Sequence, residues 1–114
     1  MSPYANFTTI VNRVAAQFVS PPVGHHNVYV ALLEGMGGPG SYGVYVGMTG
    51  LDPDERFANH KAGHKASRWV RDFGTTLLPA ALHLRGIGYA DAVRIEGELH
   101  RALIGAGMTA LGGH

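Results

Sequence analysis

Residues 27–56, NVYVALLEGMGGPGSYGVYVGMTGLDPDER, contain the pattern that decides the fold. Two apolar runs in this stretch alternate at period two and are rich in β-branched and aromatic residues, which predicts two strands. Residues 34–41 between them are rich in glycine and predict a turn, so we expect an antiparallel hairpin. A turn centred there predicts that Tyr29 lies opposite Tyr45, to within about one residue, with the two rings on one face of the sheet.

Two glycines, Gly43 and Gly47, flank Tyr45 on its own face of the predicted strand. A glycine inside a strand often marks the close approach of a ligand or of another backbone segment. We therefore expect that something other than a side chain can approach the Tyr45 ring, which makes Tyr45 the more accessible of the two tyrosines.

The segment after the hairpin carries strong signals for the start of a helix. Asp52 can cap this helix and Pro53 suits its first position, and we expect the helix to end at Gly63. Arg56 and His60 are four residues apart, so they lie on one face of the helix. Because the hairpin is directly upstream, we expect that face to meet the tyrosines; the alternative is a pair of solvated polar side chains.

A second short helix is predicted from Lys65 to Phe73, ended by Gly74. Its apolar side should be buried, and Trp69 fits a core position better than a stacking platform. Basic side chains recur on another side of this helix, close to a lysine of the preceding helix. These candidate nucleic-acid-binding residues are Lys61, Lys65, Arg68 and Arg71. Such a basic stripe can neutralise phosphates, although an ordinary solvated face has the same pattern.

The last third of the chain predicts a strand and a long helix. Because of Pro79, we expect a third strand, Ala80 to Arg85, at an edge of the sheet. A final helix is expected from about Ala90 to Ile104. Glu96 falls beside the apolar stripe of this helix, whereas Glu98 falls on the far side with two arginines. We therefore expect Glu96 to face the body of the protein, where a carboxylate needs a cation, a proton or a metal ion.

Residues 1–23 precede the hairpin and predict one further helix. This helix is expected to begin at a capping threonine, Thr8 or Thr9, and to end near Val19. We expect the extension to pack on the core or on a partner, and residues 24–114 to form the main domain.

The order of these polar residues resembles the GIY-YIG nuclease family, and the resemblance covers roughly residues 26 to 112. The matching elements are Asn27-Val28-Tyr29, Tyr45-Val46-Gly47, Thr49, the pair Arg56 and His60, and Glu96 on the last helix. There are two departures from the family pattern. Asn27 stands where the family name has glycine, and Leu111-Gly112 stands where Leu-Asn is usual.

The resemblance implies an α+β fold, with a small three-stranded mixed or antiparallel sheet flanked by helices. It also implies a metal-dependent endonuclease that hydrolyses phosphodiester bonds. In that reading Arg56 neutralises the phosphorane, Tyr29 or Tyr45 activates water with His60 as proton partner, and Glu96 holds Mg²⁺ or Mn²⁺. A tyrosine base needs a pKa below its usual value of about 10, and we expect Arg56 and the metal ion to lower it.

The missing asparagine should lower the rate of phosphodiester cleavage. Losing one preorganised donor costs on the order of a hundredfold, so the resemblance implies a slow nuclease. His114 is a candidate replacement because its ring can donate a hydrogen bond. We also expect Gly112→Asn to restore the amide and raise the cleavage rate.

The composition narrows the class of protein. The chain has 114 residues, which suits one compact domain, and its net charge of +1 means that any nucleic-acid site must be a local patch. The absence of cysteine excludes a disulfide scaffold and a thiolate zinc site, and it fits the cytoplasmic location that we expect. No apolar run approaches the roughly 18 residues that span a bilayer, so we expect no membrane partner.

Nucleic acid is the expected partner, with DNA favoured over RNA. No specificity domain is evident, so a dimer, a partner protein or a structured substrate would have to supply target choice. Two alternatives stay open: a nucleic-acid-binding module with weak or lost catalysis on the same fold, and a docking domain that uses the N-terminal helix. Mg²⁺-dependent cleavage would separate the nuclease from the binding module.

Overall fold

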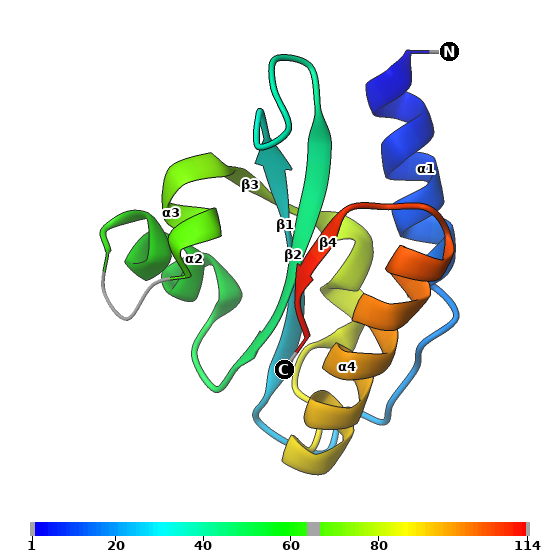
Figure 1. The fold of residues 1–114 in the computed structure, drawn as a ribbon. Helices are drawn as coiled ribbons and strands as arrows, with labels where there is room; N and C mark the ends of the chain where they lie inside the picture. Colours follow the sequence, from blue (N-terminus) through cyan, green and yellow to red (C-terminus); the bar gives the residue numbers. More distant parts are fainter. Residues whose placement is uncertain (1, 64–66, 114) are drawn as a thin grey trace.

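The computed structural model describes residues 2–63 and 67–113 and shows an α+β fold. A four-stranded mixed sheet, in the order β3-β1-β2-β4, lies between two groups of helices (Figure 1). The elements in chain order are α1 (Pro3–Ala15), β1 (Asn27–Glu34), β2 (Tyr42–Thr49), α2 (Pro53–Lys61), α3 (Arg68–Phe73), β3 (Gly74–Leu78), the 3₁₀ helix η1 (Pro79–Leu84), α4 (Tyr89–Gly105) and β4 (Ala110–Gly112). None of the helices in these two described ranges is long and apolar enough to cross a membrane.

The predicted hairpin is present, but its register differs from the prediction. β1 and β2 pair antiparallel, with Tyr29 opposite Gly47 and Ala31 opposite Tyr45. The expected pairing of the two tyrosines is thus wrong by two residues, because the connection is centred one position later than the glycine-rich segment suggested. A shift of two residues keeps each side chain on its face, so the tyrosines still share one face, as diagonal neighbours.

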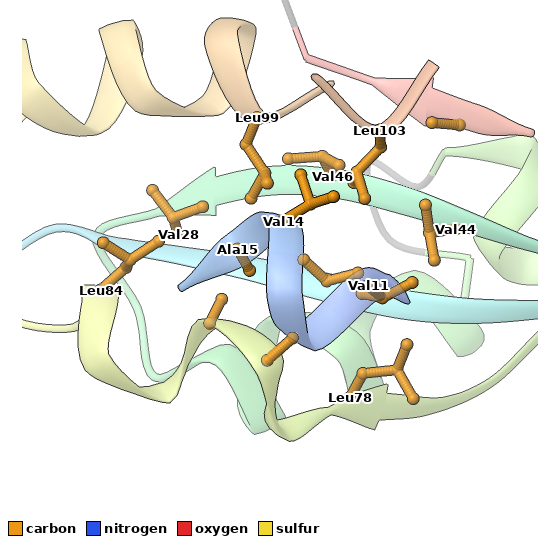
Figure 2. Close-up of a cluster of buried hydrophobic side chains, with 14 of the residues drawn as sticks. Val11, Val14, Ala15, Val28, Val44, Val46, Leu78, Leu84, Leu99 and Leu103 are labelled. Carbon is orange, nitrogen blue, oxygen red and sulfur yellow. The ribbon is translucent and has the colours of Figure 1, made fainter. Parts of the chain in front are cut away.

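The two faces of the sheet hold separate cores. On one face, even-numbered residues of the hairpin pack against α1, η1 and α4. Figure 2 shows this larger core, with Val14 of α1 and Leu99 and Leu103 of α4 directed at the sheet around Val46. On the other face, the two tyrosines pack with α2 and α3 around Val70. The site residues on β1 and β2 therefore lie on the α2–α3 side.

The sheet has four strands instead of the three that were expected. β3 covers Gly74–Leu78, and the segment predicted as the third strand forms η1 instead. Pro79 begins this 3₁₀ helix, where its fixed φ is suitable; the strand lies before the proline, and it is an edge strand as predicted. β4 is parallel to β2 and pairs with Val44, Tyr45 and Val46. Three residues are too few for the alternation that would have predicted it.

Two helix starts are informative. α1 begins at Pro3, after Ser2, whose hydroxyl accepts a hydrogen bond from the Ala5 amide at 3.1 Å. The predicted start at Thr8 or Thr9 and the predicted end near Val19 are therefore wrong. α2 begins as predicted, because the Asp52 carboxylate accepts a hydrogen bond from the Asp54 amide at 2.9 Å. The start of α3 can be compared only from Ser67 onward, since Lys65 lies outside the described residues.

Candidate active site

A pocket of about 350 Å³ opens beside the last residues of β2. It is lined by Tyr29, Tyr45, Gly47, Met48, Arg56, His60, Tyr89, Val93 and Glu96. β4 pairs with β2 only as far as Val46, so this pocket lies where β2 continues past the end of its neighbour. The five side chains expected to be catalytic come from β1, β2, α2 and α4 and meet in this pocket; what each does there stays a prediction.

Tyr29 lies across Gly47, so the expectation that something other than a side chain approaches the Tyr45 ring there is wrong. A Cβ atom at residue 47 would collide with Cζ and Oη of Tyr29. At the other glycine, residue 43, a Cβ would lie 3.1 Å from the carbonyl oxygen of Thr109. The spaces on either side of Tyr45 are therefore filled by the protein itself, and both tyrosines are buried, at 4% exposed for Tyr29 and 9% for Tyr45.

His60 connects α3 to Tyr29 through two hydrogen bonds. The Ser67 backbone amide donates to His60 Nδ1 at 2.8 Å, and His60 Nε2 lies 3.2 Å from the Tyr29 hydroxyl. A ring nitrogen that accepts from a backbone N–H carries no proton of its own. The neutral ring therefore holds its proton on Nε2, and that N–H donates to the Tyr29 oxygen. His60 in this state is a donor to Tyr29 and not an acceptor of its proton.

Burial works against ionisation of all three rings. Burial, followed by the nearby Arg56 charge, lowers the pKa of His60, which keeps the imidazole neutral. Burial is also the largest cause that raises the pKa of Tyr29, ahead of the Tyr45 charge, and it outweighs the hydrogen bond and charge of Arg56. For Tyr45, burial and then the Glu96 charge raise the pKa, against a hydrogen bond from Ser67. Arg56 lowers the pKa of both tyrosines, as expected, but desolvation is larger, so without a metal ion neither pKa falls below its usual value.

Glu96 is the buried carboxylate of the site. It is 5% exposed, whereas Glu98 bonds Arg94 at 3.0 Å on the exposed side of the same helix. The predicted phase of this helix is therefore confirmed. α4 belongs to the larger core on the opposite face of the sheet, so Glu96 reaches the tyrosine side at the open edge of β2. The negative charge of Glu96 and the positive charge of Arg56 act on both tyrosines, in opposite directions.

The donor set suits a magnesium ion shared with a substrate better than a metal caged by protein. No group of three His, Asp or Glu side chains in the described ranges is arranged to hold a metal ion. Mg²⁺ commonly uses one or two carboxylates together with substrate phosphates and water. A buried carboxylate that lines an open pocket matches this requirement, so Glu96 fits the role that the resemblance implies.

Asn27, the first departure from the family pattern, has a structural role. Its Nδ2 donates to the Leu51 carbonyl at 2.9 Å, and its Oδ1 accepts from the Gly86 amide at 2.9 Å. These bonds tie the start of β1 to the connection before α2 and to the segment before α4. A glycine could make neither bond, so the asparagine holds together the elements that carry Arg56 and Glu96.

Gly112, the second departure, cannot be replaced simply by asparagine. Its φ is +84°, and a Cβ there would collide with the carbonyl oxygen of Val46. The expectation that Gly112→Asn restores a missing amide therefore fails on steric grounds. The proposed replacement, His114, lies outside the described residues.

The basic stripe is present in part. Lys61, Arg68 and Arg71 are exposed on α2 and α3, while Lys65 lies outside the described residues. Lys61 Nζ donates to the Arg71 carbonyl at 3.0 Å, and Arg71 pairs with Asp72 at 3.0 Å. Of the three, only Arg71 has an acidic partner within hydrogen-bond distance in the described ranges; Lys61 bonds a backbone carbonyl, and Arg68 lies over the Trp69 ring.

The exposure of Trp69 contradicts the prediction that it belongs to the core. Its side chain is 36% exposed instead of part of the core. It stacks on Phe73 with ring centroids 6.3 Å apart, and the Arg68 guanidinium lies 4.9 Å from its ring centroid. The core position next to it belongs to Val70, which is fully buried.

Sequence reasoning missed two residues of this site. Ser67 supplies the amide that fixes the His60 proton and a hydroxyl that bonds Tyr45, but a lone serine near a helix start gives no signal beyond capping. Tyr89 lines the mouth of the pocket, and it lies two turns before Glu96 on α4. Periodicity places it on the Glu96 side of the helix, so this signal was available in the sequence.

No family model, curated protein or solved structure matches this chain. The case for a function therefore rests on the residues of the pocket and on their chemistry.

Proposed function

We propose that this protein is a metal-dependent endonuclease that hydrolyses phosphodiester bonds in nucleic acid, similar in its site to GIY-YIG nucleases. The observation that carries the proposal is the meeting of Arg56, Glu96 and the hydrogen-bonded pair Tyr29 and His60 in one open pocket. Phosphodiester hydrolysis needs a cation for the phosphate, a base for water and support for the leaving oxygen. The pocket offers a residue for each task.

The chain's own residues divide these tasks as follows. Arg56 holds a non-bridging oxygen of the phosphate. The Tyr29 oxygen accepts hydrogen bonds from His60 Nε2 and from Arg56, and both donors favour its phenolate over its phenol. The phenolate takes a proton from water, the water oxygen bonds to phosphorus, and the bond to the 3′ oxygen breaks. Glu96 would hold Mg²⁺ or Mn²⁺, which supplies positive charge to the phosphate and the leaving oxygen when bound.

The arrangement favours Tyr29 over Tyr45 as the base. Tyr29 receives two donors at its oxygen, from His60 and Arg56, whereas the Tyr45 oxygen receives one, from Ser67; the Glu96 charge opposes ionisation of both rings. Tyr45 packs beside Tyr29 with ring centroids 6.4 Å apart. We assign Tyr45 to positioning the ring of Tyr29 and the phosphate.

Cleavage assays with Mg²⁺, Mn²⁺ or EDTA test the proposal. Supercoiled, branched and single-stranded DNA and RNA should be offered as substrates. We expect slow cleavage that EDTA abolishes and that Glu96→Gln removes. Absence of cleavage on every substrate, with binding retained, would favour the binding module.

A further inference from the structure

The end of the pocket away from His60 is apolar and exposed. Tyr89 is 63% exposed and Val93 is 38% exposed, and Met48 completes this end of the lining. His26 packs against Tyr89 in an edge-on arrangement, with ring centroids 5.0 Å apart and an interplanar angle of 72°. One side of the Tyr89 ring is thus supported by protein, while most of its surface remains in contact with solvent.

The order of side chains along α4 is the reverse of what core packing produces. Tyr89, Val93 and Glu96 are spaced by four and three residues, so they form one line along the helix. The two apolar members of this line are exposed and the charged member is buried. An exposed apolar patch at the rim of a pocket is typical of a ligand-binding surface. The same pocket is lined by these side chains, by Met48 and by the Arg56 guanidinium, so a ligand with an anionic end and an aromatic end would fit it.

We propose that Tyr89, Val93 and Met48 form a subsite for one nucleobase, unstacked from its neighbours, next to the phosphate held at Arg56. This proposal rests on the proposed function. From Tyr89 to Glu96 the helix rises about 10 Å, a length that accommodates a sugar and a base attached to a phosphate in the same pocket. Aromatic rings bind bases of any sequence by stacking, so the subsite selects strands whose bases are already free, such as single strands, junctions or flaps.

Small ligands test the subsite separately from catalysis. The probes are thymidine 5′-monophosphate, 2-deoxyribose 5-phosphate and inorganic phosphate, titrated in Mg²⁺ and followed by NMR. We expect the nucleotide to shift the Tyr89 and Val93 resonances and to bind about tenfold more tightly than the sugar phosphate, because stacking on an aromatic ring is lost without the base. Sugar phosphate and phosphate should shift only the Arg56 end of the pocket.

Three variants test whether the Tyr89 ring causes the preference for the nucleotide. Tyr89→Ala should remove the difference between nucleotide and sugar phosphate, whereas Tyr89→Phe should keep it because the ring remains. Tyr4→Ala is the matched control, since Tyr4 is also an exposed tyrosine, at 38%, and it packs on Tyr42 away from the pocket. Equal affinity for nucleotide and sugar phosphate in the unmodified protein, or an unchanged difference in Tyr89→Ala, would overturn the subsite.

The two proposals fail in different ways. Base-dependent binding without any cleavage supports the subsite and removes the nuclease. Metal-dependent cleavage without base-dependent binding, and with equal rates for Tyr89→Ala and the unmodified protein, supports the nuclease and overturns the subsite.

Discussion

At the scale of single residues, the proton positions in the site follow from one backbone amide. Ser67 N–H occupies His60 Nδ1, so the only ring proton of neutral His60 points at Tyr29. Protonating His60 would place a second N–H against the Ser67 amide, which faces it as a donor. This arrangement opposes the imidazolium form and makes His60 a fixed donor to the Tyr29 oxygen.

Replacing Ser67 by proline should release the His60 proton. Proline removes the amide N–H, and the φ of −63° at Ser67 is one that proline adopts. Ser67→Ala is the matched control, because it keeps the amide and loses only the hydroxyl. In Ser67→Pro we expect ¹⁵N NMR to show both neutral tautomers of His60 and a pKa closer to its usual value of about 6.5. Identical His60 spectra in the two variants would refute the role of the amide.

The cleavage rate should rise with pH. Because burial raises the pKa of Tyr29, the ring is a phenol near neutral pH, and each added pH unit increases its phenolate fraction about tenfold. A log-linear increase between about pH 7 and pH 9 is therefore expected, and Tyr29→Phe should abolish cleavage. An ultraviolet titration of the unmodified protein and of Tyr29→Phe gives an independent check. The two titrations should differ by one tyrosine that ionises above about pH 10. A flat rate profile would exclude Tyr29 as the base.

The two glutamates of α4 provide a matched pair. Glu96→Gln should abolish metal-dependent cleavage and leave nucleic-acid binding measurable, because the change removes the charge of the buried carboxylate at nearly constant shape. Glu98→Gln should change the rate by no more than about threefold, since an exposed ion pair such as Glu98 with Arg94 contributes little. Equal losses in the two variants would show that the burial of Glu96 has no catalytic meaning.

At the scale of elements, local signals predicted the hairpin and α4 well, because each carries a long and unbroken period. The face on which Tyr29 and Tyr45 lie depends only on alternation, so it survived an error of two residues in register. β4 and the exposure of Trp69 depend on which segments meet in space, and a window of sequence does not contain that information. Ser67 acts on His60 through its backbone amide, which every residue except proline has, so the residue type could not reveal this contact.

Gly112 sets the position of β4 against β2. Gly112→Asn should destabilise the protein by at least about 1–3 kcal/mol, because the new Cβ collides with the Val46 carbonyl. Gly107→Asn is the control: its φ of +88° matches the +84° of Gly112, and a Cβ at residue 107 would have nothing within 4 Å. Thermal unfolding should therefore show a lower midpoint for Gly112→Asn alone. Faster cleavage by Gly112→Asn with an unchanged unfolding midpoint would contradict this prediction and support an asparagine at this position.

At the scale of the whole molecule, the net charge is only +1, so binding to nucleic acid would depend on where individual cations lie. Lys61, Arg68 and Arg71 lie on α2 and α3, the helices on the tyrosine side of the sheet, which also carry Asp54, Glu55 and Asp72. α1 packs on the opposite side. A strand held at Arg56 would therefore pass along the α2–α3 layer if these cations bind its phosphates.

Salt dependence of binding measures that contact directly. Each phosphate neutralised by a cation adds roughly 0.7–0.9 to the slope of log K against log salt concentration. Arg68→Ala should lower the slope by about that amount and leave sequence preference unchanged, whereas Arg71→Ala should have a smaller effect because Asp72 already pairs with Arg71. Arg13→Ala, an exposed arginine on α1, is the control for net charge alone. If Arg13→Ala and Arg68→Ala lower the slope equally, the strand does not follow α3, and Arg68 serves only the solvated surface beside Trp69.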